Sequence, residues 1–130
     1  MSHWTSAKIR IKNPDRELLK LALQAIAKEL GVQTVAENYM VIGYNGRQRC
    51  PFAIPLKLPY GNGYGVYIDE NGEVRVVVDD HGAPLSAREF ANKLTQYYTT
   101  LAVQVAAQQL GFIVTDARQT PQGIVLDLTR

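Results

Sequence analysis

Apolar and polar residues alternate along several short stretches of the chain, a pattern typical of β-strands with one buried face. At residues 4–12, Ile9 and Ile11 alternate with basic residues, so we expect a strand whose basic side chains face solvent. Further short apolar stretches predict strands at residues 32–35, 39–44, 48–54, 66–68, 73–79, 112–114 and 124–128. The Asn-Gly pairs at 45–46 and 71–72 favour two-residue hairpin turns between neighbouring strands.

Helical spacing of apolar residues begins after Asn13-Pro14, where asparagine suits the N-cap and proline the first helical position. This helix should end at Gly31, because glycine readily takes the left-handed conformation of a helix exit. Its predicted buried stripe consists of Leu19, Leu23, Ile26 and Leu30.

A longer helix is predicted from the capping box of Ser86 and Glu89 to Leu110. Its predicted buried face consists of Phe90, Leu94, Tyr97, Tyr98, Leu101 and Val105. Threonine and valine are frequent in its middle and form helices poorly in isolation, so we expect packing against a sheet to stabilise it.

Prolines and glycines interrupt the middle of the chain. Pro51, Pro55 and Pro59 lack backbone donors, so we expect their segment at a sheet edge or outside the sheet. Residues 60–65, Tyr-Gly-Asn-Gly-Tyr-Gly, predict a flexible turn; the alternative is a backbone cradle for a phosphate.

The sequences of the two predicted helices are similar to each other. Residues 17–31 and 97–111 align without a gap and match at six of 15 positions, including Gly31 and Gly111. Each helix follows a charged strand and precedes two short apolar runs, so a β-α-β-β unit occurs twice, over approximately residues 7–44 and 73–128. We therefore predict one α+β domain over residues 1–130, with both helices on one face of a mostly antiparallel sheet. The other face would be open or covered by a partner.

The amino-acid composition excludes few classes of function. The chain has 130 residues, 46% of them hydrophobic, and a net charge of +2, which does not indicate a polyanionic partner. Residues 1–65 carry nine Lys/Arg against four Asp/Glu, and residues 66–130 carry five against eight. Such an asymmetry can steer an acidic ligand or make two copies attract head to tail; the simpler interpretation is scattered solvated charges. We see no membrane span or signal segment and expect a cytoplasmic protein.

Several short motifs are similar to those of one known family. They are Met1-Ser2-His3, Val41-Ile42-Gly43-Tyr44-Asn45-Gly46, Gly63-Tyr64-Gly65, Val76–Asp79, Leu94-Thr95-Gln96-Tyr97-Tyr98 and Gln109-Leu110-Gly111-Phe112. Together they span nearly the whole chain, which on these residues resembles the hypothetical chloroplast reading frame thirty-five family of cyanobacteria, algal plastids and some phages. The resemblance supports the architecture and implies no reaction, because no activity is attached to that family.

Candidate binding residues lie in the first half of the chain. Lys8, Arg10 and Lys12 project from one face of the first strand at about 7 Å intervals, close to the spacing of phosphates along a nucleic-acid strand. Arg47, Arg49 and Tyr64 are the other binding candidates, with Tyr39, Tyr44, Tyr60 and Tyr67 as further aromatic residues. Basic residues interleaved with aromatic ones suit single-stranded nucleic acid; the alternative is an ordinary solvated strand beside half-buried tyrosines.

Reactive groups are sparse. Asp79, Asp80 and His81 could form a small hydrolytic or metal site if their side chains converge, and otherwise end a strand. Cys50 lies near two arginines that could lower its pKa, although a small buried thiol is the simpler interpretation.

Met1-Ser2-His3 would chelate Cu(II) or Ni(II) only if the initiator methionine is retained. We expect no catalytic residues, no metal and no cofactor. The preferred hypothesis is a non-catalytic binding or assembly module whose partner is a second copy or another protein. Nucleic-acid binding and a small hydrolase are the alternatives.

Overall fold

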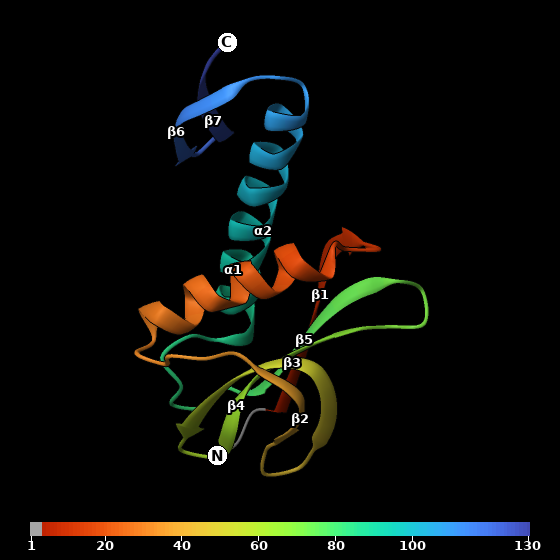
Figure 1. The fold of residues 1–130 in the computed structure, drawn as a ribbon. Helices are drawn as coiled ribbons and strands as arrows, with labels where there is room; N and C mark the ends of the chain where they lie inside the picture. The colour runs from red at the N-terminus through yellow and green to blue at the C-terminus, as the bar shows by residue number, and fades with distance from the viewer. Residues whose placement is uncertain (1–3) are drawn as a thin grey trace.

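The computed structural model describes residues 4–130, which form an α+β fold with two sheets (Figure 1). The elements are β1 (Trp4–Lys12), α1 (Arg16–Glu29), β2 (Ala36–Ile42), β3 (Arg47–Leu58), β4 (Gly61–Ile68), β5 (Glu73–Asp79), α2 (Ala87–Gln109), β6 (Ile113–Thr120) and β7 (Gly123–Thr129). Five strands form an antiparallel sheet in the order β1-β5-β4-β3-β2. The predicted α+β class is confirmed. However, β6 and β7 form a separate two-stranded sheet and do not join the main one.

The start of α2 agrees with the prediction from the sequence, and the start of α1 differs from it. At α2, Ser86 Oγ accepts a hydrogen bond from Glu89 N at 3.0 Å and Glu89 Oε1 accepts one from Ser86 N at 2.9 Å, so the capping box is confirmed. The N-cap of α1 is Asp15, and the expectation of Asn13 was wrong. Asn13 has a φ of 49° and donates its N–H to Gly72 O at 2.7 Å, so the β4–β5 turn holds it outside the helix.

The helix exits are equivalent. Gly31 and Gly111 have φ values of 77° and 88°, and the next residues donate to corresponding carbonyls, Val32 N to Ala27 O at 2.8 Å and Phe112 N to Ala107 O at 3.0 Å. The order β-α-β-β also occurs twice along the chain. The hairpins that follow the two helices differ, however, because only β2–β3 belongs to the main sheet.

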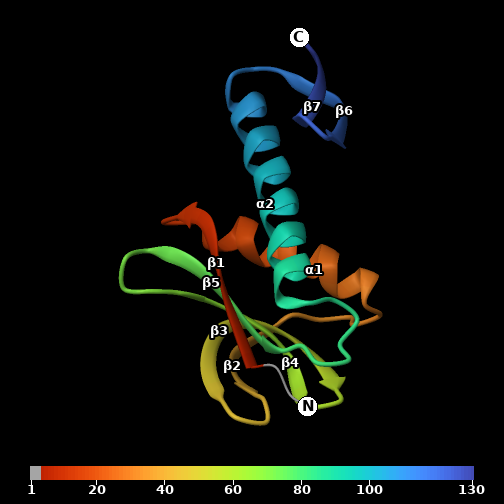
Figure 2. The ribbon, with the colours of Figure 1, turned by 180° about the vertical axis from the view of Figure 1, so that it is seen from behind.

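Both helices cover the same face of the main sheet, and α1 crosses α2 there (Figures 1 and 2). Apolar side chains of both helices and the sheet form the main core, which includes Leu19, Leu23, Ile26, Ile54, Val66, Val76, Phe90 and Leu94. At its centre the ring of Tyr64 stacks on that of Phe90, with centroids 4.7 Å apart. The Tyr64 hydroxyl donates to Leu85 O at 2.7 Å and accepts from Leu85 N at 3.0 Å, which ties the start of α2 to β4.

The opposite face of the sheet is not open, contrary to the expectation from sequence. Val41, Cys50, Ala53 and Val77 form a second, smaller buried cluster there, with Trp4 packed against it. The Trp4 indole lies so close to the β2–β3 turn that a Cβ at Gly46 would meet it at 2.4 Å. The sheet therefore curls until its first strand touches the turn at its other edge, and this curl covers the face.

Two of the three prolines lie inside the main sheet, so the expected position at a sheet edge or outside the sheet was wrong for Pro51 and Pro55; Pro59 lies in the turn between β3 and β4, outside the strands. Pro51 and Pro55 belong to β3, which pairs with both β2 and β4. The pairing of β2 with β3 skips Pro51, and it extends only as far as Ala53, which lies opposite Ala36 at the start of β2. Neither Pro51 nor Pro55 is therefore paired with a residue of β2, so their missing N–H groups cost that ladder no hydrogen bond. Residues 61–65, expected to be part of a turn, belong to strand β4.

Helix α2 is longer than the core beneath it. Its 23 residues span about 35 Å, and four of its five buried residues lie in its first eight positions: Ala87, Phe90, Ala91 and Leu94. Beyond Leu101 the helix leaves the main sheet, and β6 packs against it (Figure 1). We call residues 102–130 the C-terminal arm.

Replacement of Tyr64 by phenylalanine should lower the free energy of unfolding by about 1–3 kcal/mol, because it leaves the N–H and C=O of Leu85 without their shared partner. Urea titration followed by far-UV circular dichroism measures this change. Tyr44→Phe is the matched control, since Tyr44 is 72% exposed, and it should shift stability by less than about 0.5 kcal/mol. Equal effects of the two variants would contradict the anchoring role of Tyr64.

Candidate functional site

The basic residues of β1 are on the surface, as expected. Lys8, Arg10 and Lys12 are exposed and alternate with the buried Ile9 and Ile11. The ammonium of Lys8 is paired with Glu73 at 3.0 Å. Because β1 is an edge strand of the main sheet, these cations also line an unpaired strand edge, where charged side chains discourage addition of another strand.

The arginines of β3 lie elsewhere. Arg47 and Arg49 are exposed, and Arg49 donates to the backbone oxygen of Asn38 on β2 at 3.0 Å. Strands β5 and β4 separate β3 from β1 in the sheet, and the end of β1 that approaches the β2–β3 turn is the Trp4 end. The structure therefore does not gather the two groups of basic residues into one patch.

The tyrosines divide between the core and the surface. Tyr64 is fully buried against Phe90, so its ring offers no stacking face to a ligand. Tyr39 donates its hydroxyl to Asn62 O at 2.8 Å and packs on the smaller core. Tyr44 and Tyr60 remain accessible and meet edge to face, with centroids 6.2 Å apart.

Asp79, Asp80 and His81 do not converge on one point. Asp79 is fully buried and its carboxylate accepts the Tyr44 N–H at 3.0 Å. Asp80 accepts the N–H of Ala87 at 2.7 Å and so caps the first turn of α2. His81 lies against the ring of Tyr60, with centroids 5.3 Å apart. Each side chain has a separate structural role, and no group of three metal-ligating side chains occurs within residues 4–130.

Cys50 is a buried core residue. Its burial raises the pKa of the thiol to about 11, so the thiol is protonated at neutral pH and the arginines in its strand do not activate it. A Cβ on Gly65 would meet its sulfur at 2.5 Å, which shows how tightly the small core is packed. The Met1-Ser2-His3 motif lies outside the described residues.

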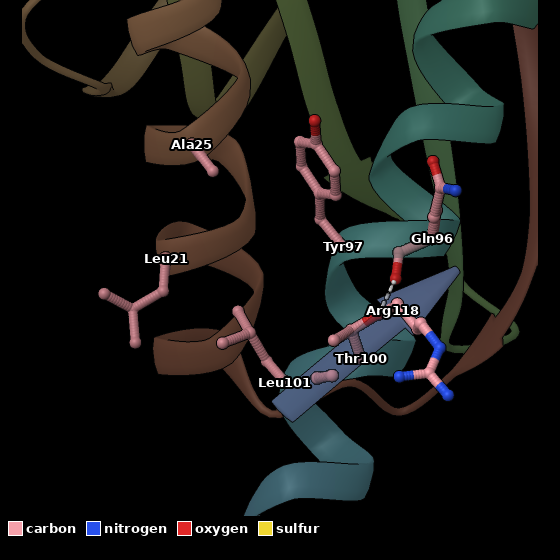
Figure 3. Close-up of a pocket in the computed structure, with 8 residues that line it drawn as sticks. Leu21, Ala25, Gln96, Tyr97, Thr100, Leu101 and Arg118 are labelled. Atoms are coloured by element: carbon pink, nitrogen blue, oxygen red, sulfur yellow. Dashed lines mark hydrogen bonds between the residues drawn. The ribbon is translucent and has the colours of Figure 1, made fainter. Parts of the chain in front are cut away.

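An open apolar groove lies beside the C-terminal arm (Figure 3). It has a volume of about 560 Å³ and is lined by Leu21, Ala25, Gln96, Tyr97, Thr100, Leu101, Ala117 and Arg118. These residues come from the outer face of α1, the middle of α2 and strand β6. Three separate elements therefore meet around one mostly apolar hollow.

Most polar side chains around the groove are already engaged in hydrogen bonds or ion pairs. Thr100 donates its hydroxyl to Gln96 O at 2.8 Å, as the dashed line in Figure 3 marks. Arg118 forms ion pairs with Asp116 at 2.9 Å and Asp127 at 3.2 Å. Tyr97 and Lys93 both donate to Glu29, and these hydrogen bonds, that of Lys93 foremost, lower the pKa of the Glu29 carboxyl. The groove thus offers chiefly apolar contact area.

Exposed apolar side chains continue from the groove along the arm. Leu21 is 49% exposed, Leu110 68% and Ile113 60%, and Val103 and Leu128 are also exposed. Residues 94–115 contain no Asp, Glu, Lys or Arg. This uncharged stretch could have indicated an exposed apolar surface from the sequence alone. It was instead interpreted as part of a helix that packs on a sheet along its whole length. No helix within residues 4–130 is long and apolar enough to cross a membrane.

Comparison with known proteins identifies one family. The family model described as "Protein of unknown function (DUF1257)" matches residues 26–126, which include all of α2 and the strands of the main sheet from β2 to β5. No curated protein and no solved structure matches the chain. Because the matched region covers well over half of the 130 residues, the chain belongs to the DUF1257 family.

Proposed function

We propose that this protein is a non-catalytic assembly module that binds another polypeptide through the C-terminal arm and the adjoining groove. The supporting observations are the exposed apolar side chains of α1, α2, β6 and β7 beside the groove and the absence of charged residues from 94 to 115. Apolar side chains exposed in numbers beside a groove are typical of interaction sites in proteins that otherwise fold on their own. The same motifs that suggested the hypothetical chloroplast reading frame thirty-five family lead us to propose that relationship as well.

The composition of α2 supports a protein partner. Its distal half contains Thr99, Thr100, Val103 and Val105, which are weak helix formers, and most of it lies beyond the main core. Helices in water depend mainly on tertiary packing of their apolar face. A partner polypeptide laid against this half would supply packing that the main sheet does not reach.

Site-specific photo-crosslinking tests this function. A photoreactive amino acid at Val103, which is 39% exposed, should give covalent adducts with the purified chain or with an extract of the source cells. The matched control places the same amino acid at Asn45, an exposed residue in the β2–β3 turn at the other end of the molecule (Figure 1). We expect adducts at position 103 and few at position 45. No adducts at either position, or equal yields at both, would contradict the proposed function.

A second candidate function is binding of single-stranded nucleic acid along β1, favoured by the exposed Lys8, Arg10 and Lys12 on one strand face. If this occurs, the Lys8→Gln, Arg10→Gln, Lys12→Gln triple variant should bind more weakly. It should also reduce the salt dependence of log K by about 0.7 for each phosphate that the protein no longer neutralises. Filter binding with a labelled oligonucleotide across a salt series measures both quantities.

The matched control for that experiment is Lys28→Gln, Lys57→Gln, Arg88→Gln, which removes the same charge from exposed positions on other elements. Equal weakening in both triple variants would indicate a net-charge effect only. Absence of salt-sensitive retention by the unmodified protein would eliminate this candidate.

A further inference from the structure

The edge strands of the two sheets differ in how their edges are protected. Strand β1 carries Lys8, Arg10 and Lys12, and β2 contains Asn38, whose φ of 50° interrupts its extended backbone. Charges and backbone irregularities are the usual means by which proteins prevent strands from adding to a sheet edge. Both edges of the main sheet are thus protected.

Strand β7 has no such protection. Its sequence is Gly-Ile-Val-Leu-Asp-Leu-Thr, without lysine, arginine or proline. Its one charged residue, Asp127, is paired with Arg118 of β6. On one side β7 pairs with β6, and β6 is the strand that packs against α2, so the other edge of β7 is the outer edge of the small sheet. An apolar strand edge whose one charge is already paired is a template for an additional strand.

A two-stranded hairpin is also marginally stable in water, because three or more strands or packing on a helix are needed to stabilise a sheet. Here the hairpin has contact with α2 through β6, but Ile113 and Leu128 remain 60% and 42% exposed. More strands on the β7 side would extend the sheet and cover apolar surface on the arm.

We propose, on the basis of the assembly function above, that the partner is a second copy of this chain whose β7 pairs antiparallel with β7 across a two-fold axis. The two hairpins then form one four-stranded antiparallel sheet. A two-fold interface requires a surface complementary to itself, and the apolar β7 edge meets this condition, since its one carboxylate is already paired within the hairpin.

The sequence of β7 fits such self-pairing. With Leu126 opposite its own copy, Ile124 lies opposite Leu128 and Val125 opposite Asp127. Apolar residues then pair with apolar residues on one face, and the two Asp127 side chains are not directly opposite each other. Apolar cross-strand pairs of this kind stabilise antiparallel sheets.

The test measures the mass of the protein in solution by sedimentation equilibrium over a concentration series. The unmodified chain of 14.5 kDa should form dimers. Leu126→Lys should weaken the dimer at least about tenfold, because it places two like charges directly opposite each other. Ile42→Lys is the matched control, since Ile42 is an exposed apolar residue on the edge strand β2, and this variant should keep the affinity of the unmodified chain.

Leu126→Cys provides a second measurement that does not depend on a disruptive charge. Directly opposed residues of antiparallel strands have Cβ atoms about 4.5–5.5 Å apart, so a small approach of the two strands lets mild oxidation give a covalent dimer of this variant. The native Cys50 is buried and should not compete. Ile42→Cys is the corresponding control and should remain monomeric after denaturation without reductant.

A purified chain that stays monomeric at all concentrations would overturn the proposal. So would a dimer that is insensitive to Leu126→Lys and fails to crosslink through Leu126→Cys. In either case, adducts of the Val103 photoprobe with a different protein would leave the assembly function intact. The two failures are therefore distinguishable.

Discussion

The length of α2 relative to the core beneath it determines the rest of the structure. Tyr64 stacks on Phe90 and its hydroxyl joins both backbone groups of Leu85, so the start of the helix is fixed to β4. The capping box of Ser86 adds two further hydrogen bonds there. Because the main core holds mainly the first turns of a 23-residue helix, the remainder projects and carries β6 and β7 with it. The groove and the exposed edge of β7 both follow from this anchoring.

The main sheet leaves little surface for function. Its helical face is filled by α1 and α2, and its other face is covered by its own curl around Val41, Cys50 and Val77. The close contact of Trp4 with Gly46 leaves no room for a side chain at position 46. The carboxylates that suggested a hydrolytic or metal site, Asp79 and Asp80, accept hydrogen bonds from backbone N–H groups and so have structural roles. The proposed binding role therefore rests on the apolar arm.

Local sequence patterns predicted local structure well. The strand at residues 4–12, the Ser86 capping box and the helix exits at Gly31 and Gly111 depend on a few neighbouring residues, and all are present. The predictions were wrong where contacts between residues far apart in the sequence determine the structure. Pro51 lies in an interior strand because the pairing skips it, and the final hairpin has its own sheet because α2 carries it away from the main one. The burial of Tyr64 likewise depends on Phe90, far along the chain. The groove joins α1, α2 and β6, a combination that periodicity within any single element does not reveal.

Amide hydrogen exchange in dilute and concentrated solutions of the unmodified protein tests most directly whether a second copy completes the arm. Amides near Phe90 belong to the main core and should exchange slowly at both concentrations. Amides of residues 103–109 and of β7 should exchange at least about tenfold more slowly in the concentrated sample, because pairing of β7 stabilises the whole arm. Equal protection of the arm and the core at both concentrations would contradict the account, since the arm would then be stable without a partner.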